Sequence, residues 1–461
     1  MSKKFDFNYI VIGSGPAGSS AALTLAKAKK KVALVEASHY GGANLNTRDV
    51  PYGVALDFAH TFARVRTYPE LRNQDFTFSF PTIVARQLKT TLTLSEENKK
   101  AYSDAGVVCL DGYAHFLDKH TIAVGDRQFT AANFIVATGS HLKISEIAGT
   151  ESVKYLTPET AIKIRRMPKA VMVVGGGATG CEIAEYFAEL GTKVLIAEMS
   201  DRILPREDKE VSEVMTDYFA RHLGITVLPG AKVVAIERDK TSKRVIFHDG
   251  RSEKMVRVDC VVLATGSEPS MDLGLENAGV KYKATGITVD KLFQTSEKNI
   301  FAIGDCIGGE SSTERAEYEG SVLAANIANK TKNLISYTGA VRITNPFPSV
   351  ATVGMNEQDL MKRDRKFKKA IVKLDEINAS RINGFAHGFV KFMLDRNQHI
   401  IGATIVAPHA ELMAPEIALA IRHQLTVFEI ASTPHDSNSW NYAVKLAARK
   451  VAIKTINKKK R

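Results

Sequence analysis

The chain has 461 residues, 44% of them apolar and 24% charged, and it carries a formal net charge of +12. This length exceeds what one hydrophobic core supports and predicts two or three domains. No apolar run approaches the roughly 18 residues needed to span a bilayer, which excludes a protein built on membrane-spanning helices.

The spacing of the cysteines and histidines excludes two further classes. Cys109, Cys181, Cys260 and Cys306 stand far apart, and the twelve histidines are scattered. This usage favours a reducing, cytoplasmic location without a disulfide framework, and it predicts no metal site. The short apolar run at the N-terminus enters a glycine turn rather than a cleavage site, so we interpret it as a buried strand and not as a signal peptide.

The excess positive charge gathers in three segments, at 27–31, 361–369 and 454–461. Basic clusters of this kind can contact nucleic acid or an anionic membrane. None of the three carries interleaved aromatic residues, which leaves solvated protein faces and a frayed terminus as the preferred interpretation. Neither nucleic acid nor a membrane is therefore expected as a partner.

The N-terminal segment has the pattern of a dinucleotide-binding unit. An apolar run at 7–12 leads into Gly13, Gly15 and Gly18, and an apolar helical stripe and a second apolar strand follow up to Glu36. In such a turn the first glycine makes the bend, the second lets a pyrophosphate approach the backbone, and the third allows close packing of helix on strand. The helix N-terminus offers N–H groups to phosphate, and Glu36 can accept hydrogen bonds from ribose hydroxyls.

The same pattern returns 162 residues later. Gly175, Gly177 and Gly180 follow an apolar strand, and Glu198 ends the next strand at the spacing that separates Gly13 from Glu36. One G-x-G-x-x-G is a weak signal, but two complete strand–turn–helix–strand units predict two nucleotide sites. A carboxylate at Glu198 bonds a free 2′-hydroxyl and repels a 2′-phosphate, which favours NADH over NADPH.

Three further strand ends are candidates for nucleotide contact. The segments 134–140 and 261–267 are both apolar strands that run into Ala-Thr-Gly, a turn that lets backbone approach a ligand. The segment 295–309 contains an apolar strand that ends at Gly304 and Asp305. A carboxylate at the carboxyl end of a parallel strand faces the crevice in which ligand hydroxyls bind.

Together these motifs resemble the flavoprotein pyridine nucleotide–disulfide oxidoreductases, the group of dihydrolipoamide dehydrogenase, glutathione reductase and mercuric reductase. The likeness runs nearly end to end, through GSGPAG, GGANLN, ATGS, GGGATGCE, ATGSEP, AIGDC and the C-terminal segments 348–360, 388–394 and 400–421. The resemblance implies FAD on the first unit, NADH on the second and a homodimer built through the C-terminal domain. The cofactor-binding positions that it implies are Gly13, Gly15, Gly18, Glu36, Gly42, Ala114, Gly139 and Asp305 for FAD, and Gly175, Gly177, Gly180, Glu198 and Gly266 for NADH.

The chain departs from this family at the catalytic centre. The two redox cysteines of the family's C-x4-C stretch correspond to Asn44 and Asp49, and a lysine that follows them corresponds to Gly53. The acid that pairs with that lysine is kept as Glu182, and an aromatic gate over the nicotinamide corresponds to Ala178. An amide and a carboxylate cannot accept two electrons by thiolate exchange, so dithiol chemistry is not expected.

The family's C-terminal His-Pro, a proton relay donated by the partner subunit, corresponds to Thr433 and Pro434. His435 follows directly, so it is a candidate relay, and a solvated loop histidine is the alternative. Asp49 is the expected proton donor and Asn44 a hydrogen-bond donor to flavin or acceptor, unless both only replace lost packing.

These residues predict an FAD-dependent oxidation of NADH in which reduced flavin passes its electrons directly to a small-molecule acceptor such as a quinone or oxygen. Asn44, Asp49, Glu182 and His435 are the catalytic candidates. One alternative is an FAD-binding scaffold or sensor with little turnover that acts through partner binding. The other is a flavin-dependent dehydrogenase of an organic substrate that uses NAD as acceptor.

The predicted fold class is α/β, with two Rossmann-like FAD- and NAD(P)-binding domains and a C-terminal α+β dimerisation domain. The expected boundaries are 1–150 and 268–337 for the FAD domain, 151–267 for the NAD domain and 338–461 for the interface domain with its basic tail.

Overall fold

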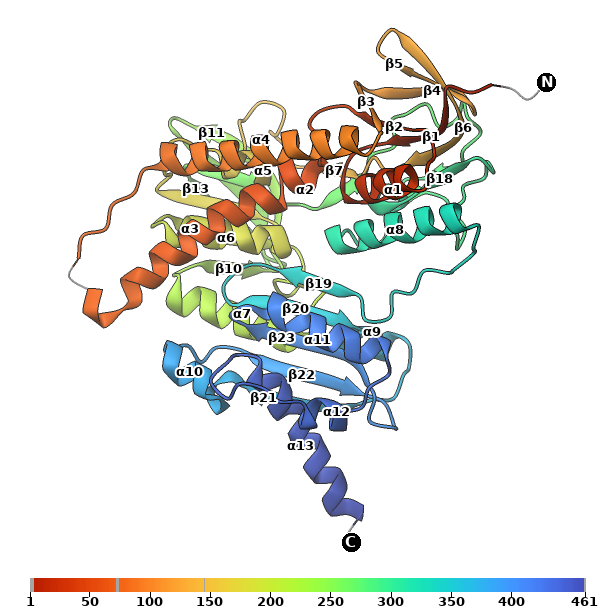
Figure 1. The fold of residues 1–461 in the computed structure, drawn as a ribbon. Coiled ribbons are helices and arrows are strands. Elements are labelled where there is room, and N and C mark those ends of the chain that lie inside the picture. The colour runs from red at the N-terminus through yellow and green to blue at the C-terminus, as the bar shows by residue number, and fades with distance from the viewer. Residues whose placement is uncertain (1–3, 72–73, 145, 460–461) are drawn as a thin grey trace.

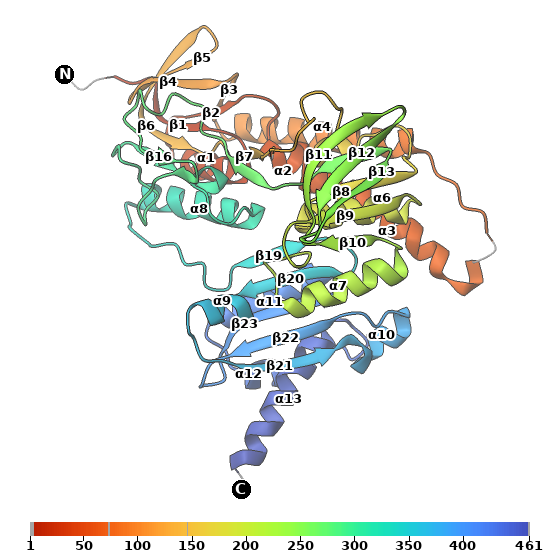
Figure 2. The ribbon, with the colours of Figure 1, turned by 180° about the vertical axis from the view of Figure 1, so that it is seen from behind.

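A computed structural model describes residues 4–71, 74–144 and 146–459, and side chains only as far as residue 452. The three largest sheets organise this part of the chain, and Figures 1 and 2 show two of them side by side above the third. The end of the basic tail, residues 460–461, and the side chains of the tail lie outside this description.

The first sheet has the strand order β3-β2-β1-β6-β5-β4, with β18 beside β6. Its centre is parallel, because β1 pairs with both β2 and β6 in that sense. Helices α1 and α8 lie along one face and approach closely, since a Cβ at Gly320 would stand 2.2 Å from the Ala17 carbonyl oxygen. The elements of this unit are β1 Phe7–Ile12, α1 Pro16–Lys27, β2 Val32–Glu36, β3 Val108–Asp111, β4 Ala114–Asp118, β5 Thr121–Val124, β6 Arg127–Val136, β16 Tyr282–Lys283, β17 Gly286–Ile287, β18 Ile300–Ala302, η2 Gly304–Ile307 and α8 Thr313–Asn329.

The second sheet is parallel, in the order β10-β9-β8-β14, and an antiparallel sheet of β11, β12 and β13 accompanies it. Its strands β8 and β14 are almost wholly apolar, as strands buried on both faces require. The elements are α5 Pro158–Ala161, β8 Ala170–Val174, α6 Ala178–Glu189, β9 Lys193–Glu198, α7 Lys209–His222, β10 Thr226–Pro229, β11 Lys232–Asp239, β12 Ser242–His248, β13 Glu253–Val258 and β14 Cys260–Leu263.

The two Ala-Thr-Gly turns of the sequence meet at the boundary between these units. Each turn leads into a short strand, β7 (Ser140–Leu142) or β15 (Ser267–Pro269), and the two strands pair antiparallel. The chain therefore passes between the two units at two adjacent places, once after each turn. The separate sequences of the turns did not predict this relation.

The third sheet is antiparallel, in the order β19-β20-β23-β22-β21, with α11 packed on β20 and β23 and α13 on β21 and β22. Strands β22 and β23 are buried along their whole length and form the core of this unit. The elements are β19 Val341–Thr344, β20 Ser349–Gly354, α9 Glu357–Lys362, β21 Lys368–Lys373, η3 Leu374–Glu376, α10 Asn378–Asn383, β22 Phe389–Leu394, β23 Ile400–Ala407, α11 Ala410–Arg422, α12 Val427–Ser432 and α13 Tyr442–Lys459.

Between β2 and β3 the chain inserts α2 (Gly42–Asn46), the long helices α3 (Asp49–Thr67) and α4 (Phe80–Asp104), and the short turn η1 (Pro69–Leu71). Helix α3 packs on both α4 and α6, so it spans from the first unit to the second. This helix positions the site described below. Within residues 4–71, 74–144 and 146–459, none of the helices is both long and apolar enough to cross a bilayer.

A buried polar network joins the second unit to the C-terminal sheet. Lys391 on β22 has no exposed surface, and its Nζ lies 2.8 Å from Oδ2 of Asp208, 2.9 Å from Oε2 of Glu210 and 3.0 Å from Oε2 of Glu357. The hydroxyl of Thr404 also donates to Asp208, at 2.7 Å. The start of α7 is thereby fixed to the face of the C-terminal sheet.

Candidate functional site

The first glycine turn has the shape of a phosphate cradle. Gly13 has φ +101°, and a Cβ there would lie 2.3 Å from the carbonyl oxygen of Ala137, so only glycine fits. A Cβ at Gly18 would lie 1.9 Å from the carbonyl oxygen of Gly13, which shows how closely α1 packs on the turn. At Gly15 a Cβ would meet nothing within 4 Å, so the N-terminus of α1 is open to an approaching anion.

Glu36 lies at the end of β2, where it anchors this turn. Its Oε2 accepts hydrogen bonds from the Ser14 N–H at 3.1 Å and from the Ser14 hydroxyl at 2.5 Å. Its Oε1 accepts from the Ser38 N–H at 2.9 Å. The carboxylate stands beside the open turn, where a ribose would be placed by a pyrophosphate on α1.

The second unit repeats this geometry almost atom for atom. A Cβ at Gly175 would lie 2.3 Å from the Ala264 carbonyl oxygen, one at Gly180 would lie 1.9 Å from the Gly175 carbonyl oxygen, and one at Gly177 would meet nothing. Glu198 accepts from the N–H groups of Gly176 at 2.6 Å and of Ser200 at 2.7 Å. Two open helix N-termini, one beside the half-buried Glu36 and one beside the buried Glu198, fit two dinucleotides such as FAD and NADH.

The other predicted cofactor positions lie in both units. Gly42 abuts it, since a Cβ there would lie 2.6 Å from Cα of Gly15, and Gly139 and Gly266 are open and have positive φ. Asp305 accepts from the Ser140 hydroxyl at 2.8 Å. Ala114 is different, because its side chain is buried in the core and only its backbone can meet a ligand.

Arg48 is a residue of this site that we did not single out from the sequence. Its Nη1 lies 3.9 Å from Oδ2 of Asp305, and its Nη2 donates to the backbone oxygen of Ser140 at 3.4 Å. A guanidinium thus stands beside the predicted ribitol-binding carboxylate. Its position between Asn44 and Asp49 was the signal in the sequence.

Asn44 and Asp49 contact each other. The Asn44 Nδ2 donates to Oδ2 of Asp49 at 2.6 Å and to the hydroxyl of Thr313 at 2.9 Å, and that hydroxyl donates to the same Asp49 oxygen at 2.7 Å. This triangle, here called the Asn44–Asp49–Thr313 bridge, joins α2, α3 and α8. Oδ2 of Asp49 accepts two hydrogen bonds in this bridge.

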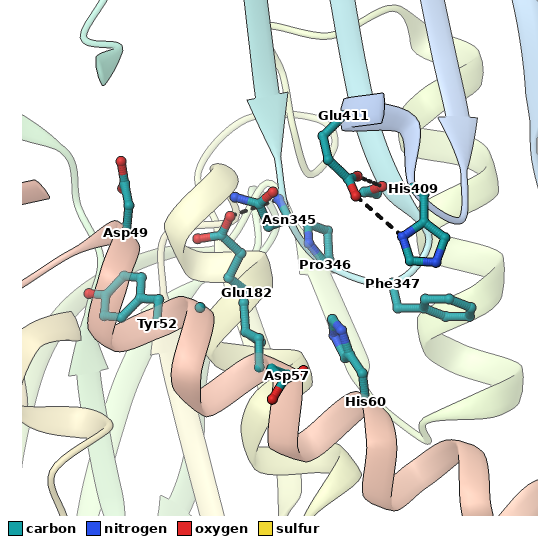
Figure 3. Close-up of a pocket in the computed structure, with 13 residues that line it drawn as sticks. Asp49, Tyr52, Asp57, His60, Glu182, Asn345, Pro346, Phe347, His409 and Glu411 are labelled. Carbon is teal, nitrogen blue, oxygen red and sulfur yellow. Dashed lines mark hydrogen bonds and ion pairs between the residues drawn. The ribbon is translucent and has the colours of Figure 1, made fainter. Parts of the chain in front are cut away.

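A cavity of about 420 Å³ opens beside this bridge (Figure 3). A Cβ at Gly53 would meet no atom within 4 Å. The absence of a side chain at this position therefore contributes part of the cavity's volume. Figure 3 shows the side chains of α3 along one side and the loop from Asn345 to Phe347 opposite. The lining residues are Asp49, Tyr52, Gly53, Leu56, Asp57, His60, Glu182, Asn345, Pro346, Phe347, Ser349, His409 and Glu411.

Glu182 is the buried acid of this cavity. Burial raises its pKa to about 7, and the charge of Asp49 acts in the same direction. The N–H of Asn345 donates to its Oε1 at 2.8 Å and lowers the pKa in part. Among the described residues no lysine or arginine forms an ion pair with Glu182, so this carboxyl exchanges a proton near neutral pH.

His435 does not belong to the cavity. Its side chain is only 3% exposed, and its Nε2 lies 3.1 Å from Oε1 of Glu416 in the same chain. The alternative of a solvated loop histidine is therefore wrong, since the ring is buried against its own subunit. The expected relay into a partner's site stays a prediction that would require the ring to leave Glu416.

All four cysteines are free thiols. Cys181 and Cys306 adjoin the glycine turn of the second unit and Asp305, but both are buried. Burial raises the pKa of Cys306 to about 12 and that of Cys181 well above its usual value. Neither thiol offers the thiolate that disulfide exchange needs.

Comparison with known proteins gives concordant results. The profile of the family described as "Pyridine nucleotide-disulphide oxidoreductase" matches residues 7–320, and the dimerisation domain of the same family matches residues 342–447. Mercuric reductase of Staphylococcus aureus is 29% identical over 450 residues, which cover 96% of this chain and 82% of that protein. Dihydrolipoyl dehydrogenase of Chlorobaculum parvum is 30% identical over 458 residues, which cover 97% of each chain.

Solved structures show the same fold. LpdA of Mycobacterium tuberculosis superposes with a TM-score of 0.88 at 25% identity, and the match covers 96% of this chain and 99% of that one. The HOCl-induced flavoprotein disulfide reductase RclA of Escherichia coli superposes with a TM-score of 0.87 at 23% identity, covering 96% and 100%. The predicted fold class is confirmed.

Proposed function

Since the chain belongs to the pyridine nucleotide-disulphide oxidoreductase family, whose cofactors are FAD and a nicotinamide nucleotide, we propose that it oxidises NADH and passes the electrons to an acceptor that is not a disulfide. The Asn44–Asp49–Thr313 bridge carries this proposal. The resemblance to the family assigns the two redox cysteines to Asn44 and Asp49 of this bridge, and an amide and a carboxylate cannot take up two electrons by thiolate exchange.

RclA, named above, is a flavoprotein disulfide reductase, so the electron acceptor is where this chain would differ from it. The cavity beside Gly53 and Glu182 supports a small molecule as acceptor, because it offers space next to the bridge. Eight of the thirteen lining residues are polar or charged, and Tyr52, Leu56, Pro346 and Phe347 supply an apolar and aromatic surface beside them. A quinone or dioxygen meets these requirements.

Bound FAD would supply the two-electron carrier between NADH and the acceptor. Oxidation of NADH yields NAD⁺ and a hydride, and reduction of a quinone to a quinol or of oxygen to hydrogen peroxide needs one more proton. We propose Glu182 as the group that holds this proton. It lies in the cavity wall and faces Asn345, with Asp49, Tyr52 and His60 as the titratable groups nearest in that wall.

The first test is anaerobic stopped-flow absorbance of the purified protein mixed with NADH or with NADPH. We expect rapid loss of flavin absorbance with NADH, slower loss with NADPH, and no thiolate–flavin charge-transfer band. If FAD is bound and neither nucleotide reduces it within minutes, the proposal is wrong. A scaffold or sensor, or a dehydrogenase with an organic donor, is then the better description.

The preference for NADH should depend on Glu198. The Glu198→Gln variant removes the charge that repels a 2′-phosphate. We expect the ratio of NADH to NADPH reduction rates to fall by about tenfold, which corresponds to about 1.4 kcal/mol. The side chain keeps its size, and FAD content serves as the control because the first unit is untouched. An unchanged ratio would show that Glu198 does not meet the 2′ position.

Turnover should depend on pH through Glu182. Its carboxyl is protonated below its pKa of about 7 and charged above it, so acceptor reduction is expected to slow as pH rises through 7. The Glu182→Gln variant should lose this dependence and reduce the acceptor on the order of 100-fold more slowly. Flavin reduction by NADH needs no added proton and should change little, which separates a proton role from general damage. Equal losses in both half-reactions would contradict it.

We also propose the domain boundaries given by the sequence, with 1–150 and 268–337 holding FAD and 151–267 holding NADH. The dimerisation domain supports a homodimer. Its segment 338–461 contains the C-terminal sheet, whose loop Asn345–Phe347 reaches the cavity.

A further inference from the structure

Helix α6 buries three glutamates on one face. Glu182, Glu185 and Glu189 follow one another at spacings of three and four residues, and none is more than 9% exposed. Burial of carboxylates is costly unless a cation or several hydrogen bonds compensate. Glu182 and Glu185 each accept a backbone N–H, from Asn345 and Phe347, whereas Oε2 of Glu189 has no hydrogen-bond partner.

A histidine of α3 faces these two acids. His60 Nε2 lies 3.4 Å from Oε2 of Glu185 and 4.0 Å from Oε2 of Glu189. The three ligand atoms lie within 4.8 Å of one another. A tetrahedral ion with bonds of about 2.1 Å keeps its ligands about 3.4 Å apart, so the observed spacing needs little adjustment.

Two of these atoms have no hydrogen-bond partner. Oε2 of Glu189 and Nε2 of His60 are both inaccessible to solvent and make no hydrogen bond. The Glu189 side chain as a whole is only 3% exposed. Glu185 accepts from the N–H of Phe347 at 2.8 Å. Buried polar atoms without a hydrogen bond need a partner, and a bound ion is one that all three atoms could share.

A second acidic cluster shows how this chain compensates such a group elsewhere. Asp208, Glu210 and Glu357 also converge within 4.8 Å, and there the ammonium of Lys391 lies among them at 2.8 to 3.0 Å. Among the described residues no lysine or arginine pairs with Glu185 or Glu189; His60 is their only basic neighbour. Among the described residues, the group of His60, Glu185 and Glu189 therefore has no lysine that corresponds to Lys391.

We propose that His60, Glu185 and Glu189 bind one divalent transition-metal ion of the Zn²⁺ class. Imidazole nitrogen with carboxylate oxygen is a ligand set that such ions accept, whereas Mg²⁺ prefers oxygen alone. His60 also lines the cavity, which gives an ion a route to its imidazole. The ion would tie α3, which begins at Asp49, to α6. Sequence spacing gave no sign of this site because His60 and Glu185 lie 125 residues apart.

The test uses the full FAD-loaded protein after treatment with a chelator. Titration calorimetry with ZnCl₂ is expected to give one site, with far weaker binding of Mg²⁺, and anomalous diffraction should place one zinc between His60, Glu185 and Glu189. The Glu189→Gln variant, which keeps side-chain size, should weaken Zn²⁺ binding at least about tenfold, the loss typical even of outer-shell partners. Zn²⁺ should raise the melting temperature of the unmodified protein more than that of the variant.

Glu357→Gln is the matched control, since it makes the same change in the cluster that Lys391 fills, and it should leave Zn²⁺ affinity unchanged. An anomalous peak elsewhere, no bound zinc, equal affinity in Glu189→Gln, or Mg²⁺ binding as tight as Zn²⁺ would overturn the proposal. If Glu189→Gln fails to fold, the position of the zinc in the unmodified protein decides the matter. None of these readouts depends on the electron acceptor.

Discussion

The Lys391→Met variant is expected to lose about 3 to 5 kcal/mol of unfolding free energy, the usual cost of removing one partner from a buried ion cluster. Lys391 is fully buried and sits within 3.0 Å of three carboxylates. Methionine fills a similar volume but supplies no charge, so Asp208, Glu210 and Glu357 would repel one another in a site of low polarity. Urea unfolding followed by circular dichroism measures the loss.

Lys369→Met is the matched control for this prediction. Lys369 contacts two of the same acids, at 3.0 Å from Glu357 and 3.7 Å from Glu210, but its side chain is 46% exposed. Exposed ion pairs contribute about 0 to 1 kcal/mol, so this variant should be nearly as stable as the unmodified protein. Similar losses in the two variants would mean that burial at Lys391 does not govern the energetics of the cluster.

Two alanine substitutions at equivalent glycines are expected to separate the two nucleotide sites. Gly18→Ala places a methyl group 1.9 Å from the carbonyl oxygen of Gly13, and Gly180→Ala places one 1.9 Å from that of Gly175. Neither carbonyl group can move away from the methyl group unless its glycine turn moves with it. We expect this displacement to cost about 1 to 3 kcal/mol of folding free energy. We expect Gly18→Ala to purify with little FAD. Gly180→Ala should keep its FAD but bind NADH about tenfold to a hundredfold more weakly.

Gly15→Ala completes this design. Gly15 has φ −63°, which any residue adopts, and a Cβ there meets no protein atom within 4 Å. The variant should therefore fold normally and still bind FAD more weakly, because the methyl group occupies the space into which pyrophosphate must come. Visible absorbance and stopped-flow reduction report both effects. FAD retention in Gly15→Ala, or unchanged NADH reduction in Gly180→Ala, would contradict the assignment of the sites.

The nucleotide units were predictable because each is local. A strand, three glycines, a helix and an acid follow one another within thirty residues, and the structure places Glu36 and Glu198 beside their turns as the spacing predicts. The resemblance to a known family located Asn44 and Asp49, but the hydroxyl that completes their bridge belongs to Thr313, more than 260 residues away.

The cavity and its acids could not be found in the same way. Glu182 meets Asn345 across 163 residues, and the glutamates of α6 look like an exposed polar stripe until α3 is packed against them. Lys391 lies in a strand whose six residues are all buried, where sequence patterns predict only apolar side chains. Long-range packing, rather than local pattern, decides which charges are buried.

The Asn44–Asp49–Thr313 bridge also makes the link between α2 and α3 independent of redox conditions. A pair of cysteines at this place could be oxidised to a disulfide or reduced to two thiols. The covalent link between α2 and α3 would then depend on the surrounding oxidant. Hydrogen bonds among an amide, a carboxylate and a hydroxyl have one covalent state in oxidising and reducing surroundings alike. The segment that begins α3 is thus insulated from the thiol–disulfide balance around the protein.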